Sequence, residues 1–166
     1  MNGEVFHGRL VRVRVDERGY EIVEHPPAVV IVAVDTDEAG ASRTWLVRVP
    51  RPAVGRSLIE APAGLIDTGE TPEEAARREL REECGVEADR WEELGAAWSS
   101  PGFTDERIHL FLATGLRRVE GEDPDGAIEE CLQVPLTQAL DLAGESMPSR
   151  AALLLAERKL RLDRTH

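Results

Sequence analysis

The chain has 166 residues, with 20 Lys or Arg against 32 Asp or Glu, so its formal net charge is −12. This length fits one domain, and 42% hydrophobic residues is enough for a packed core. The acidic balance argues against a nucleic acid polymer as partner, because such binding needs a basic face. The longest apolar run is too short to span a bilayer and no signal peptide is visible, so we expect a cytoplasmic protein without membrane contact.

The N-terminal segment is expected to form an antiparallel hairpin. Apolar and polar residues alternate over 4–15, which predicts one amphipathic strand, and a turn at 16–19 leads into a return strand over 20–24. A two-stranded ribbon alone is marginal in water and needs a surface to cover. We therefore expect a single domain, 1–166, in which a hairpin over 1–25 precedes a core over 26–166.

The strands of the core are indicated by apolar runs between polar loops. The β-branched run at 28–34 predicts a strand buried on both faces, and a polar hairpin loop follows it at 35–40. Further strands are expected over 45–49, 94–98 and 108–113. Four aromatic residues lie in or beside the expected strands, and we expect them in the core: Phe6, Tyr20, Trp45 and Trp98.

A helix is predicted over residues 71–84 by its end signals. Thr71 is a suitable N-cap, Pro72 fits the first helical position, Glu74 completes a capping box, and Gly85 suits the C-terminal end. Two more helices are expected, over 136–142 and 150–162. Strands and helices are mixed without regular βαβ alternation, which predicts an α+β fold.

Three glutamates in the first helix form an unusual cluster. Glu79, Glu82 and Glu83 are spaced i, i+3 and i+4, so they share one face of the helix and repel one another. Residues 67–93 hold 11 acids and 4 Arg, so nearby bases do not neutralise the cluster. One interpretation is a solvated acidic face. The other is a site for a hard divalent cation, Mg²⁺ or Mn²⁺, which prefers oxygen ligands.

The spacing around this cluster resembles a known signature. Residues 64–86 read Gly-x5-Glu-x7-Arg-Glu-Leu-x-Glu-Glu-x-Gly-Val, which matches the Nudix hydrolase signature at every defined position. The resemblance implies an α/β/α sandwich with a mixed sheet between helices, and hydrolysis of a nucleoside diphosphate linked to another moiety. It implies roles for six residues: Glu79, Glu83 and the Ala63 carbonyl as metal ligands, Glu82 as ligand or water-activating base, and Arg78 with Glu70 as a brace of the loop.

Other segments are similar to the ADP-ribose pyrophosphatase branch of that family. They include residues 60–64 and 99–106, with Pro101 placed 16 positions beyond Gly85 as in the branch, and the likeness extends over nearly the whole chain. It implies Mg²⁺-dependent cleavage of ADP-ribose to AMP and ribose 5-phosphate by a homodimer. The implied substrate-binding residues are Arg51, Ser100, Pro101, Gly102 and Glu106. Two alternatives stay open: another nucleotide derivative as substrate, or a sensor that binds ADP-ribose without cleaving it.

The chain departs from the branch in its acidic loop. The branch carries a catalytic Glu four residues before an Ile, and the position that corresponds here, counted from Ile128, is Pro124. Glu122 and Asp123 are close enough to supply a carboxylate if the loop is shifted, so either of them or Glu82 is a candidate general base. The alternative for this loop is a plain solvated turn.

The cysteines and histidines carry no metal or disulfide pattern. Cys84 and Cys131 are too few for a disulfide framework, and we interpret both as reduced, buried residues. The four histidines show no ligand spacing, and we assign none of them to a metal.

Overall fold

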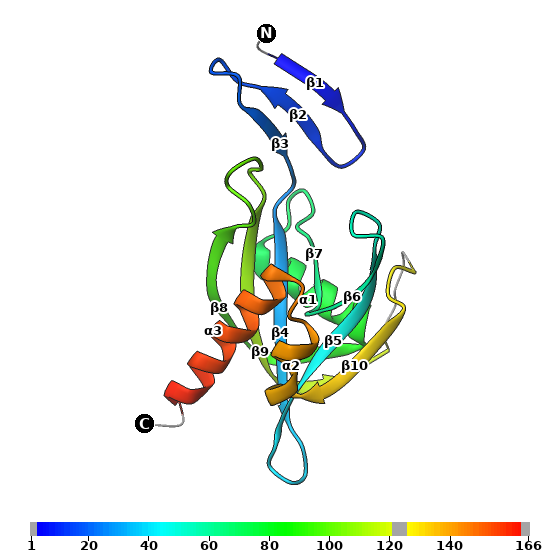
Figure 1. Ribbon diagram of the computed structural model, residues 1–166. Coiled ribbons are helices and arrows are strands. Elements are labelled where there is room, and N and C mark those ends of the chain that lie inside the picture. The colour runs from blue at the N-terminus through cyan, green and yellow to red at the C-terminus, as the bar shows by residue number, and fades with distance from the viewer. Residues whose placement is uncertain (1–2, 121–125, 164–166) are drawn as a thin grey trace.

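The computed structural model describes residues 3–120 and 126–163. Within those residues the chain forms ten strands in two sheets, together with three helices (Figure 1). The smaller sheet contains the N-terminal strands and stands beyond one end of the main body, which is built on the larger sheet (Figure 1). The chain passes from the smaller sheet to the larger one at residues 25–27.

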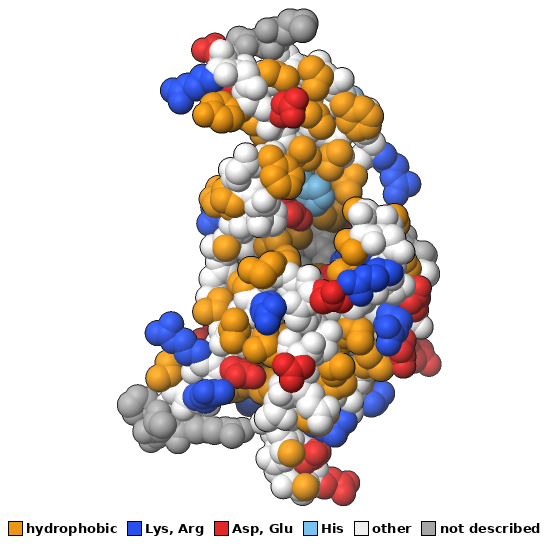
Figure 2. All heavy atoms as spheres, in the orientation of Figure 1, with side chains coloured by type: hydrophobic (Ala, Val, Ile, Leu, Met, Phe, Trp, Pro, Cys, Tyr) orange, Lys and Arg blue, Asp and Glu red, His pale blue; other side chains and the backbone are white. Residues whose placement is uncertain are grey.

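The N-terminal sheet has three antiparallel strands in the order β1-β2-β3. Their bounds are β1 Gly3–His7, β2 Arg12–Val15 and β3 Glu21–Glu24. One face of this sheet carries a group of hydrophobic side chains that the main body does not cover (Figure 2). The predicted antiparallel arrangement is confirmed, with one strand more than a hairpin has.

The single strand predicted over 4–15 is wrong, because the chain turns at Gly8. The Gly8 N–H donates to the Val11 carbonyl at 2.9 Å, which closes the turn between β1 and β2. A Cβ at Gly8 would lie 2.8 Å from the Phe6 ring, so the turn favours a residue without a side chain. The apolar alternation continues in phase across the turn, and this is why the pattern resembles one long strand.

The larger sheet is mixed, as predicted. Its main path runs β10-β5-β4-β9-β8, in which β4 and β9 are parallel and the other neighbours antiparallel, while β6 pairs with β5 and β7 with β4. The strand bounds are β4 Ala28–Thr36, β5 Ser42–Arg51, β6 Arg56–Glu60, β7 Ala63–Leu65, β8 Val86–Trp98, β9 Arg107–Arg118 and β10 Glu130–Pro135.

The apolar runs predicted the central strands well and the outer ones poorly. The predicted strand at 28–34 is the buried part of β4, and those at 45–49 and 108–113 lie within β5 and β9. The strand predicted at 94–98 is only the end of β8, which begins at Val86. The strands β6, β7 and β10 were not predicted, because their segments are short or only half-buried and show no apolar run.

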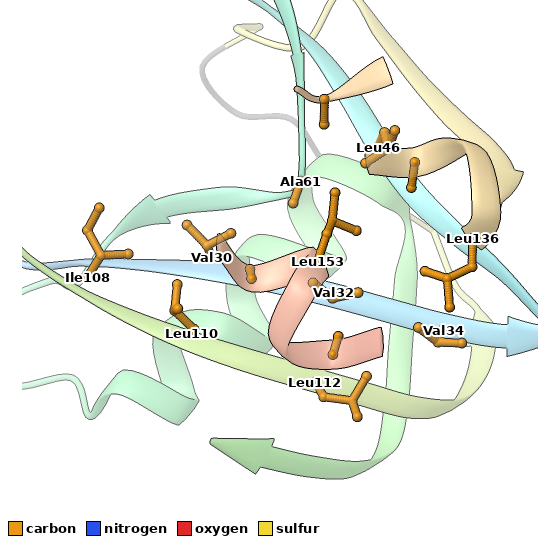
Figure 3. Close-up of a cluster of buried hydrophobic side chains, with 14 residues drawn as sticks. Val30, Val32, Val34, Leu46, Ala61, Ile108, Leu110, Leu112, Leu136 and Leu153 are labelled. Atoms are coloured by element: carbon orange, nitrogen blue, oxygen red, sulfur yellow. The ribbon is translucent and has the colours of Figure 1, made fainter. Parts of the chain in front are cut away.

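Helices cover both faces of the larger sheet. The helix α1, Pro72–Cys84, packs on one face, and α2, Leu136–Leu142, with α3, Met147–Asp163, packs on the other (Figure 1). Figure 3 shows one core layer, in which valines of β4 and leucines of β9 surround Leu153 of α3. The predicted α/β/α sandwich is confirmed. No helix among the described residues is long and apolar enough to cross a membrane.

The aromatic prediction holds for one residue of four. Trp45 is buried at 6% exposure, whereas Phe6, Tyr20 and Trp98 are each more than half exposed. Phe6 and Tyr20 belong to or adjoin the N-terminal sheet, which has no second layer over it within the described residues, so alternation there does not imply burial. Cys84 and Cys131 are free and half-buried, so they are less buried than the sequence predicted.

Candidate active site

The helix α1 is fixed at both ends by the predicted caps. The Thr71 hydroxyl accepts the Glu74 N–H at 3.3 Å, and the Glu74 carboxylate accepts the Thr71 N–H at 2.8 Å. At the other end Gly85 is left-handed, with φ 60° and ψ 42°, and its N–H bonds to the Arg81 carbonyl. Because both ends are fixed, the side chains along the helix have defined positions relative to the sheet.

The strand β7 lies directly against two of the glutamates. A Cβ built on Gly64 would lie 2.0 Å from the Glu79 Cδ, so only glycine lets the Glu79 carboxylate approach the backbone this closely. One residue earlier, the Ala63 N–H donates to the Glu83 Oε2 at 3.0 Å. The two contacts place Glu79 and Glu83 beside β7, next to Ala63. These are three of the four residues predicted as metal ligands.

Burial changes the acidity of both of these carboxyls. It raises the pKa of Glu83 from the ordinary 4.5 to about 8, against the opposing effect of the Ala63 N–H. Burial also raises the pKa of Glu79, although Arg78 opposes the change. Glu79 adds to the rise in the pKa of Glu83, and Glu82 and Glu70 add to the rise in the pKa of Glu79, so ionising both carboxyls is costly unless a cation accompanies them.

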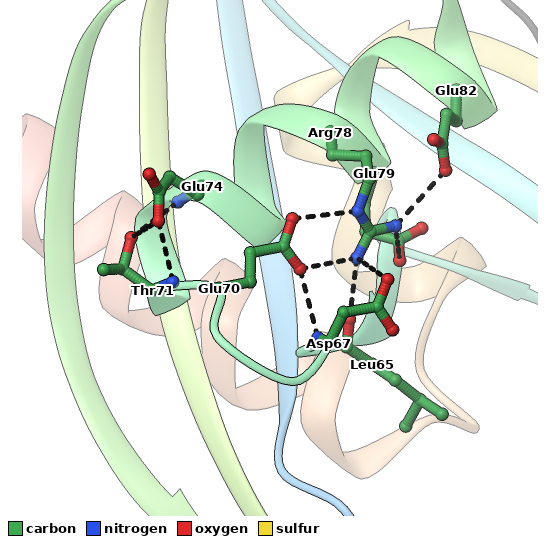
Figure 4. Close-up of polar contacts among 8 residues, drawn as sticks. All are labelled: Leu65, Asp67, Glu70, Thr71, Glu74, Arg78, Glu79 and Glu82. Carbon is green, nitrogen blue, oxygen red and sulfur yellow. Dashed lines mark hydrogen bonds and ion pairs between the residues drawn. The ribbon is translucent and has the colours of Figure 1, made fainter.

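Arg78 braces the loop before the helix (Figure 4). Its guanidinium donates to both carboxylate oxygens of Glu70 at 2.9 Å and to the Leu65 carbonyl at 2.9 Å. It also donates to Glu79 at 2.6 Å and to Glu82 at 3.3 Å. The bonds from Arg78 to the Glu70 carboxylate lower the pKa of Glu70. The Arg78–Glu70 pair that the resemblance implied is therefore present, and it ties the loop to the glutamate cluster.

The carboxylates of the glutamate cluster are not arranged around one metal position in this structure. In the part of the chain that the structure describes, no group of three or more His, Cys, Asp or Glu is arranged to hold a metal ion. Arg78 supplies the positive charge beside Glu79 and Glu82 in this arrangement. A cation shared by the two carboxylates would require at least one of them to leave Arg78.

A cleft of about 340 Å³ opens beside the cluster. Its lining includes the predicted ligands and one predicted substrate residue: Ala63, Glu79, Glu82, Glu83 and Arg51. A larger hollow of about 770 Å³ lies on the flank of α1 toward β8, where three of its lining residues, Arg81, Glu87 and Arg117, already form ion pairs. The smaller cleft is lined by both the half-buried carboxylates and an arginine, so it is the stronger candidate for the active site.

Arg51 is held at the wall of this cleft by a buried acid. Its guanidinium donates to both oxygens of Glu60, at 2.8 and 3.0 Å, and the Glu60 side chain is only 10% exposed. This bond raises the pKa of Arg51, and Glu83 and Glu106 add to the effect. An arginine fixed in this way presents its remaining N–H groups in a defined direction, which suits recognition of a phosphate.

The other predicted substrate residues lie on a separate loop. Three of them are not among the described residues that line the cleft: Ser100, Pro101 and Gly102. Glu106 ends the same loop and acts electrostatically on Arg51. The structure therefore brings Arg51 to the glutamate cluster, whereas Glu106 acts on the cleft only through its charge.

Comparison with known proteins identifies the family of the chain. The family model for the NUDIX domain matches residues 24–155 of the chain, which span the cluster, the cleft and the larger sheet. The chain belongs to the Nudix family. Its likeness to curated relatives supports a hydrolase of the ADP-ribose pyrophosphatase-like kind.

Two relatives align with most of this Nudix hydrolase. It is 34% identical over 170 residues to a methanol dehydrogenase activator of Bacillus methanolicus, covering 96% of this chain and 89% of that protein. It is 37% identical over 150 residues to an ADP-ribose pyrophosphatase of Bacillus subtilis strain 168, covering 84% and 78%. A crystal structure of an ADP compounds hydrolase has the same fold, with a TM-score of 0.76, 24% identity, and coverage of 98% and 93%.

The acidic-loop candidates of this Nudix hydrolase, Glu122 and Asp123, lie outside the described residues, as does Pro124. The described residues that follow the loop, Ala127 and Ile128, line the cleft. The described segment that begins after these positions therefore forms part of the wall of the candidate active site.

Sequence reasoning missed two residues beside the site. Glu60 had a signal, because it is an acid that ends the mostly apolar segment 58–60, and the structure buries it against Arg51. His25 had no signal beyond the two prolines that follow it. Its imidazole lies beside Glu106, which is 81 positions away in the chain.

Proposed function

We propose that this Nudix hydrolase cleaves the pyrophosphate bond of ADP-ribose, giving AMP and ribose 5-phosphate, with Mg²⁺ as cofactor and Mn²⁺ as a substitute. The observation that carries the proposal is the half-buried pair Glu79 and Glu83 in one cleft with Arg51. Acidic groups for a cation and a basic group for a phosphate are the two requirements of metal-dependent pyrophosphate hydrolysis. The name of the Bacillus subtilis relative favours ADP-ribose among the substrates of the family.

The donor set fits a hard divalent cation. Glu79, Glu83 and the Ala63 carbonyl would hold it, with Glu82 as a further ligand, and all of these offer oxygen atoms. Burial makes the ionised pair Glu79 and Glu83 costly, so a cation would relieve an existing electrostatic strain. When bound, the cation polarises the phosphoryl oxygens and lowers the pKa of a coordinated water.

The protein's own groups divide the remaining work. Arg51 binds a phosphate of the substrate and orients the scissile bond, while Arg78 holds the loop and the glutamates in fixed relative positions. A water attacks one phosphorus and loses its proton to a carboxylate oxygen, and the P–O bond to the other phosphate breaks. The base is Glu122 or Asp123 of the acidic loop, with Glu82 as the alternative on the helix.

Substrate binding is further proposed to involve the loop that ends at Glu106. Ser100, Pro101, Gly102 and Glu106 match the branch in position, and Glu106 acts on Arg51 electrostatically. The N-terminal sheet is proposed to pack against a second copy of the chain. The partners that follow are a small nucleotide derivative and an identical subunit, without a nucleic acid polymer or a membrane.

A second candidate is a related hydrolase with another substrate. The relative that aligns with 96% of this chain is named for activation of methanol dehydrogenase, so near-complete coverage does not by itself select ADP-ribose. Dinucleoside polyphosphates, nucleotide sugars and oxidised nucleoside triphosphates form this class. A sensor that binds ADP-ribose without turnover is the third alternative, and the intact glutamate set argues against it.

A substrate panel with Mg²⁺ tests these alternatives. Each compound is incubated with the protein, and the products are separated by anion-exchange chromatography. We expect ADP-ribose to give the highest kcat/KM, with equal amounts of AMP and ribose 5-phosphate. A value at least about tenfold higher for another compound would select the second candidate. Binding of ADP-ribose by calorimetry without any product would select the sensor.

A further inference from the structure

Asp67 is the least engaged acid of the cleft. It lines the cleft with the three glutamates of the cluster, and its side chain is 77% exposed. Each of those glutamates accepts a hydrogen bond, from Arg78 or from the Ala63 N–H. Within the described residues, the Asp67 carboxylate has a single charged neighbour, the Arg78 Nη2, at 4.0 Å. That distance is too long for a hydrogen bond, so the Asp67 carboxylate has none to give up if it moves.

The main chain of Asp67 is fixed, although its side chain is not. The Asp67 N–H donates to the Glu70 Oε2 at 3.1 Å, and the Asp67 carbonyl accepts the Glu70 N–H at 3.0 Å. Glu70 also accepts two hydrogen bonds from Arg78. The same acid therefore anchors the Asp67 backbone and the Arg78 guanidinium side by side (Figure 4). A shift of about 1 Å in the Asp67 carboxylate would bring it within hydrogen-bond distance of Arg78.

Cation binding in the cleft would change the acceptors of Arg78. In this structure the Arg78 Nη1 donates to Glu79 at 2.6 Å and to Glu82 at 3.3 Å. A cation that takes either carboxylate competes with its bond to Arg78. The Arg78 side chain is only 29% exposed, so water replaces a lost acceptor poorly and the loss is costly. Asp67 is the acid that lies nearby and has no hydrogen bond of its own to break.

We propose that Asp67 is a positioning residue for the cation site: when Glu79 or Glu82 turns to the cation, Arg78 exchanges that carboxylate for Asp67. The exchange keeps the guanidinium neutralised and bonded to Glu70, so the loop before α1 stays in place while the glutamates are released. This rests on the proposed function, because it concerns how the same cleft accepts its cation. Asp67 acts through Arg78 and is not itself a ligand.

Calorimetric titration of the complete protein with Mg²⁺ tests this exchange. Asp67→Asn keeps the shape of the side chain and removes its charge. We expect this variant to raise the Kd for Mg²⁺ about three- to fivefold, which corresponds to the contribution of one exposed ion pair. We expect Asp67→Glu, which retains the charge, to bring the Kd back to within about twofold of the parent value.

Thermal unfolding without a cation separates this role from a purely structural one. At 4.0 Å the Asp67–Arg78 pair contributes little before the cation binds, so Asp67→Asn should change the metal-free melting temperature by less than about 1 °C. A loss of several degrees would mean that Asp67 already stabilises the loop, which contradicts the exchange. An unchanged Kd for Mg²⁺ in Asp67→Asn contradicts it as well.

A double-mutant cycle tests whether Asp67 acts through Arg78. Arg78→Gln removes the guanidinium and with it the need for a replacement acid. Adding Asp67→Asn to that variant should therefore raise the Kd for Mg²⁺ no further. A direct attraction between Asp67 and the cation would persist without Arg78, so effects that multiply in the double variant would overturn the exchange.

The chain offers a matched control for the loss of one negative charge. Glu73 lies in the first turn of α1, pairs with Arg77 and is 51% exposed. It is not among the described residues that line the cleft. We expect Glu73→Gln to keep the Kd for Mg²⁺ within about 1.5-fold of the parent value, because exposed charges outside the cleft are screened. An increase equal to that of Asp67→Asn would assign the effect to net charge alone.

A crystal structure of the parent protein with Mg²⁺ shows the exchange without any variant. We expect the distance between the Asp67 carboxylate and the Arg78 guanidinium to fall from 4.0 Å to about 3 Å. The bond from Arg78 to Glu79 or to Glu82 should be broken in the same structure. Retention of both bonds, with Asp67 in its present place, would overturn the proposal.

The proposed function and this exchange fail in different measurements. If the parent protein neither binds Mg²⁺ nor cleaves any compound of the panel, the cation site itself is contradicted, and the exchange with it. If the parent protein binds Mg²⁺ and Asp67→Asn binds it equally well, the exchange alone is contradicted.

Discussion

Burial distinguishes Glu83 from the other acids of α1. Its carboxylate accepts the Ala63 N–H at 3.0 Å, and its pKa is still raised to about 8 because burial removes the charge from water, an effect larger than the opposing ones of the Ala63 N–H and Arg51. Exposed acids such as Glu73 instead pair with a neighbour on the helix, Arg77. The sequence shows that Glu83 belongs to the cluster, whereas only the fold shows that it is the member with the strongest reason to bind a cation or a proton.

This raised pKa predicts how metal-free stability depends on pH. The contribution of Glu83 to the free energy of unfolding is fully present below 4.5, its ordinary pKa, and is lost as the pH rises to about 8. Glu83→Gln removes this loss and keeps an acceptor for the Ala63 N–H. At pH 8 with a chelator, the variant should be more stable than the parent protein by roughly 1–3 kcal/mol.

Urea unfolding at several pH values measures this difference. The stability gap between the Gln variant and the parent protein should widen with pH and should close near the ordinary pKa of a carboxyl. A gap that stays constant with pH would mean that Glu83 is not the titrating group.

At the scale of elements, α1 and the loop before it act as one unit because of Arg78. This guanidinium joins Glu70 and the Leu65 carbonyl of the loop to Glu79 and Glu82 of the helix. A lysine at this position has a single ammonium group and cannot make the same set of bonds. The loop would then lose its fixed distance from the carboxylates that the site requires.

We predict that Arg78→Lys lowers kcat/KM by about 10–100-fold, since small displacements of a catalytic constellation are costly. The matched control is Arg77→Lys, one residue away, whose guanidinium pairs with the exposed Glu73. That variant should keep its activity, and its stability should change by less than about 1 kcal/mol. Steady-state kinetics and thermal unfolding of both variants measure these changes in activity and stability. Equal losses of activity would contradict a brace specific to Arg78.

The acidic loop is the second element whose role can be tested. If it supplies the general base, Glu122→Gln or Asp123→Asn should lower kcat by about 100-fold or more while KM changes little. We expect the larger effect at Glu122, whose side chain reaches farther. Glu82→Gln is the comparison, and it should be the severe variant only if the helix supplies the base. Single-turnover rates at saturating Mg²⁺ measure this, and a double loop variant with the full rate would exclude the loop.

The sequence predicted the elements whose signals are local. Thr71, Pro72 and Gly85 mark the ends of α1 within a few residues, and the structure agrees. The three-residue strand β7 depends on pairing with β4, so no local pattern announces it. The turn at Gly8 was hidden because apolar alternation continues through it. The contact between His25 and Glu106 joins positions 81 residues apart, and only the folded chain brings them together.

At the scale of the whole molecule, the N-terminal sheet has no complete layer over it among the residues that the structure describes. Several hydrophobic side chains in or beside its strands are about half exposed or more: Val5 63%, Phe6 55%, Leu10 49% and Tyr20 63%. A three-stranded sheet needs a hydrophobic face packed on something to be stable. We therefore predict a homodimer in which this face is covered by the second subunit.

Sedimentation velocity at micromolar concentration tests the dimer. We expect one species of twice the chain mass, and we expect Phe6→Asp to shift it toward the monomer, since a buried charge at the interface is costly. Glu38→Gln, in the loop between β4 and β5 at the other end of the main body, is the control (Figure 1). A fully active monomer would refute the prediction.

The central claim is that the half-buried carboxylates of α1 bind a divalent cation for pyrophosphate hydrolysis. The most direct measurement is the rate of AMP formation from ADP-ribose against Mg²⁺ concentration, for the parent protein and for Glu83→Gln. We predict that the parent protein requires Mg²⁺, and that the variant is slower by about 100-fold or more at low Mg²⁺. Near-equal turnover of the two proteins at low Mg²⁺ would contradict the claim.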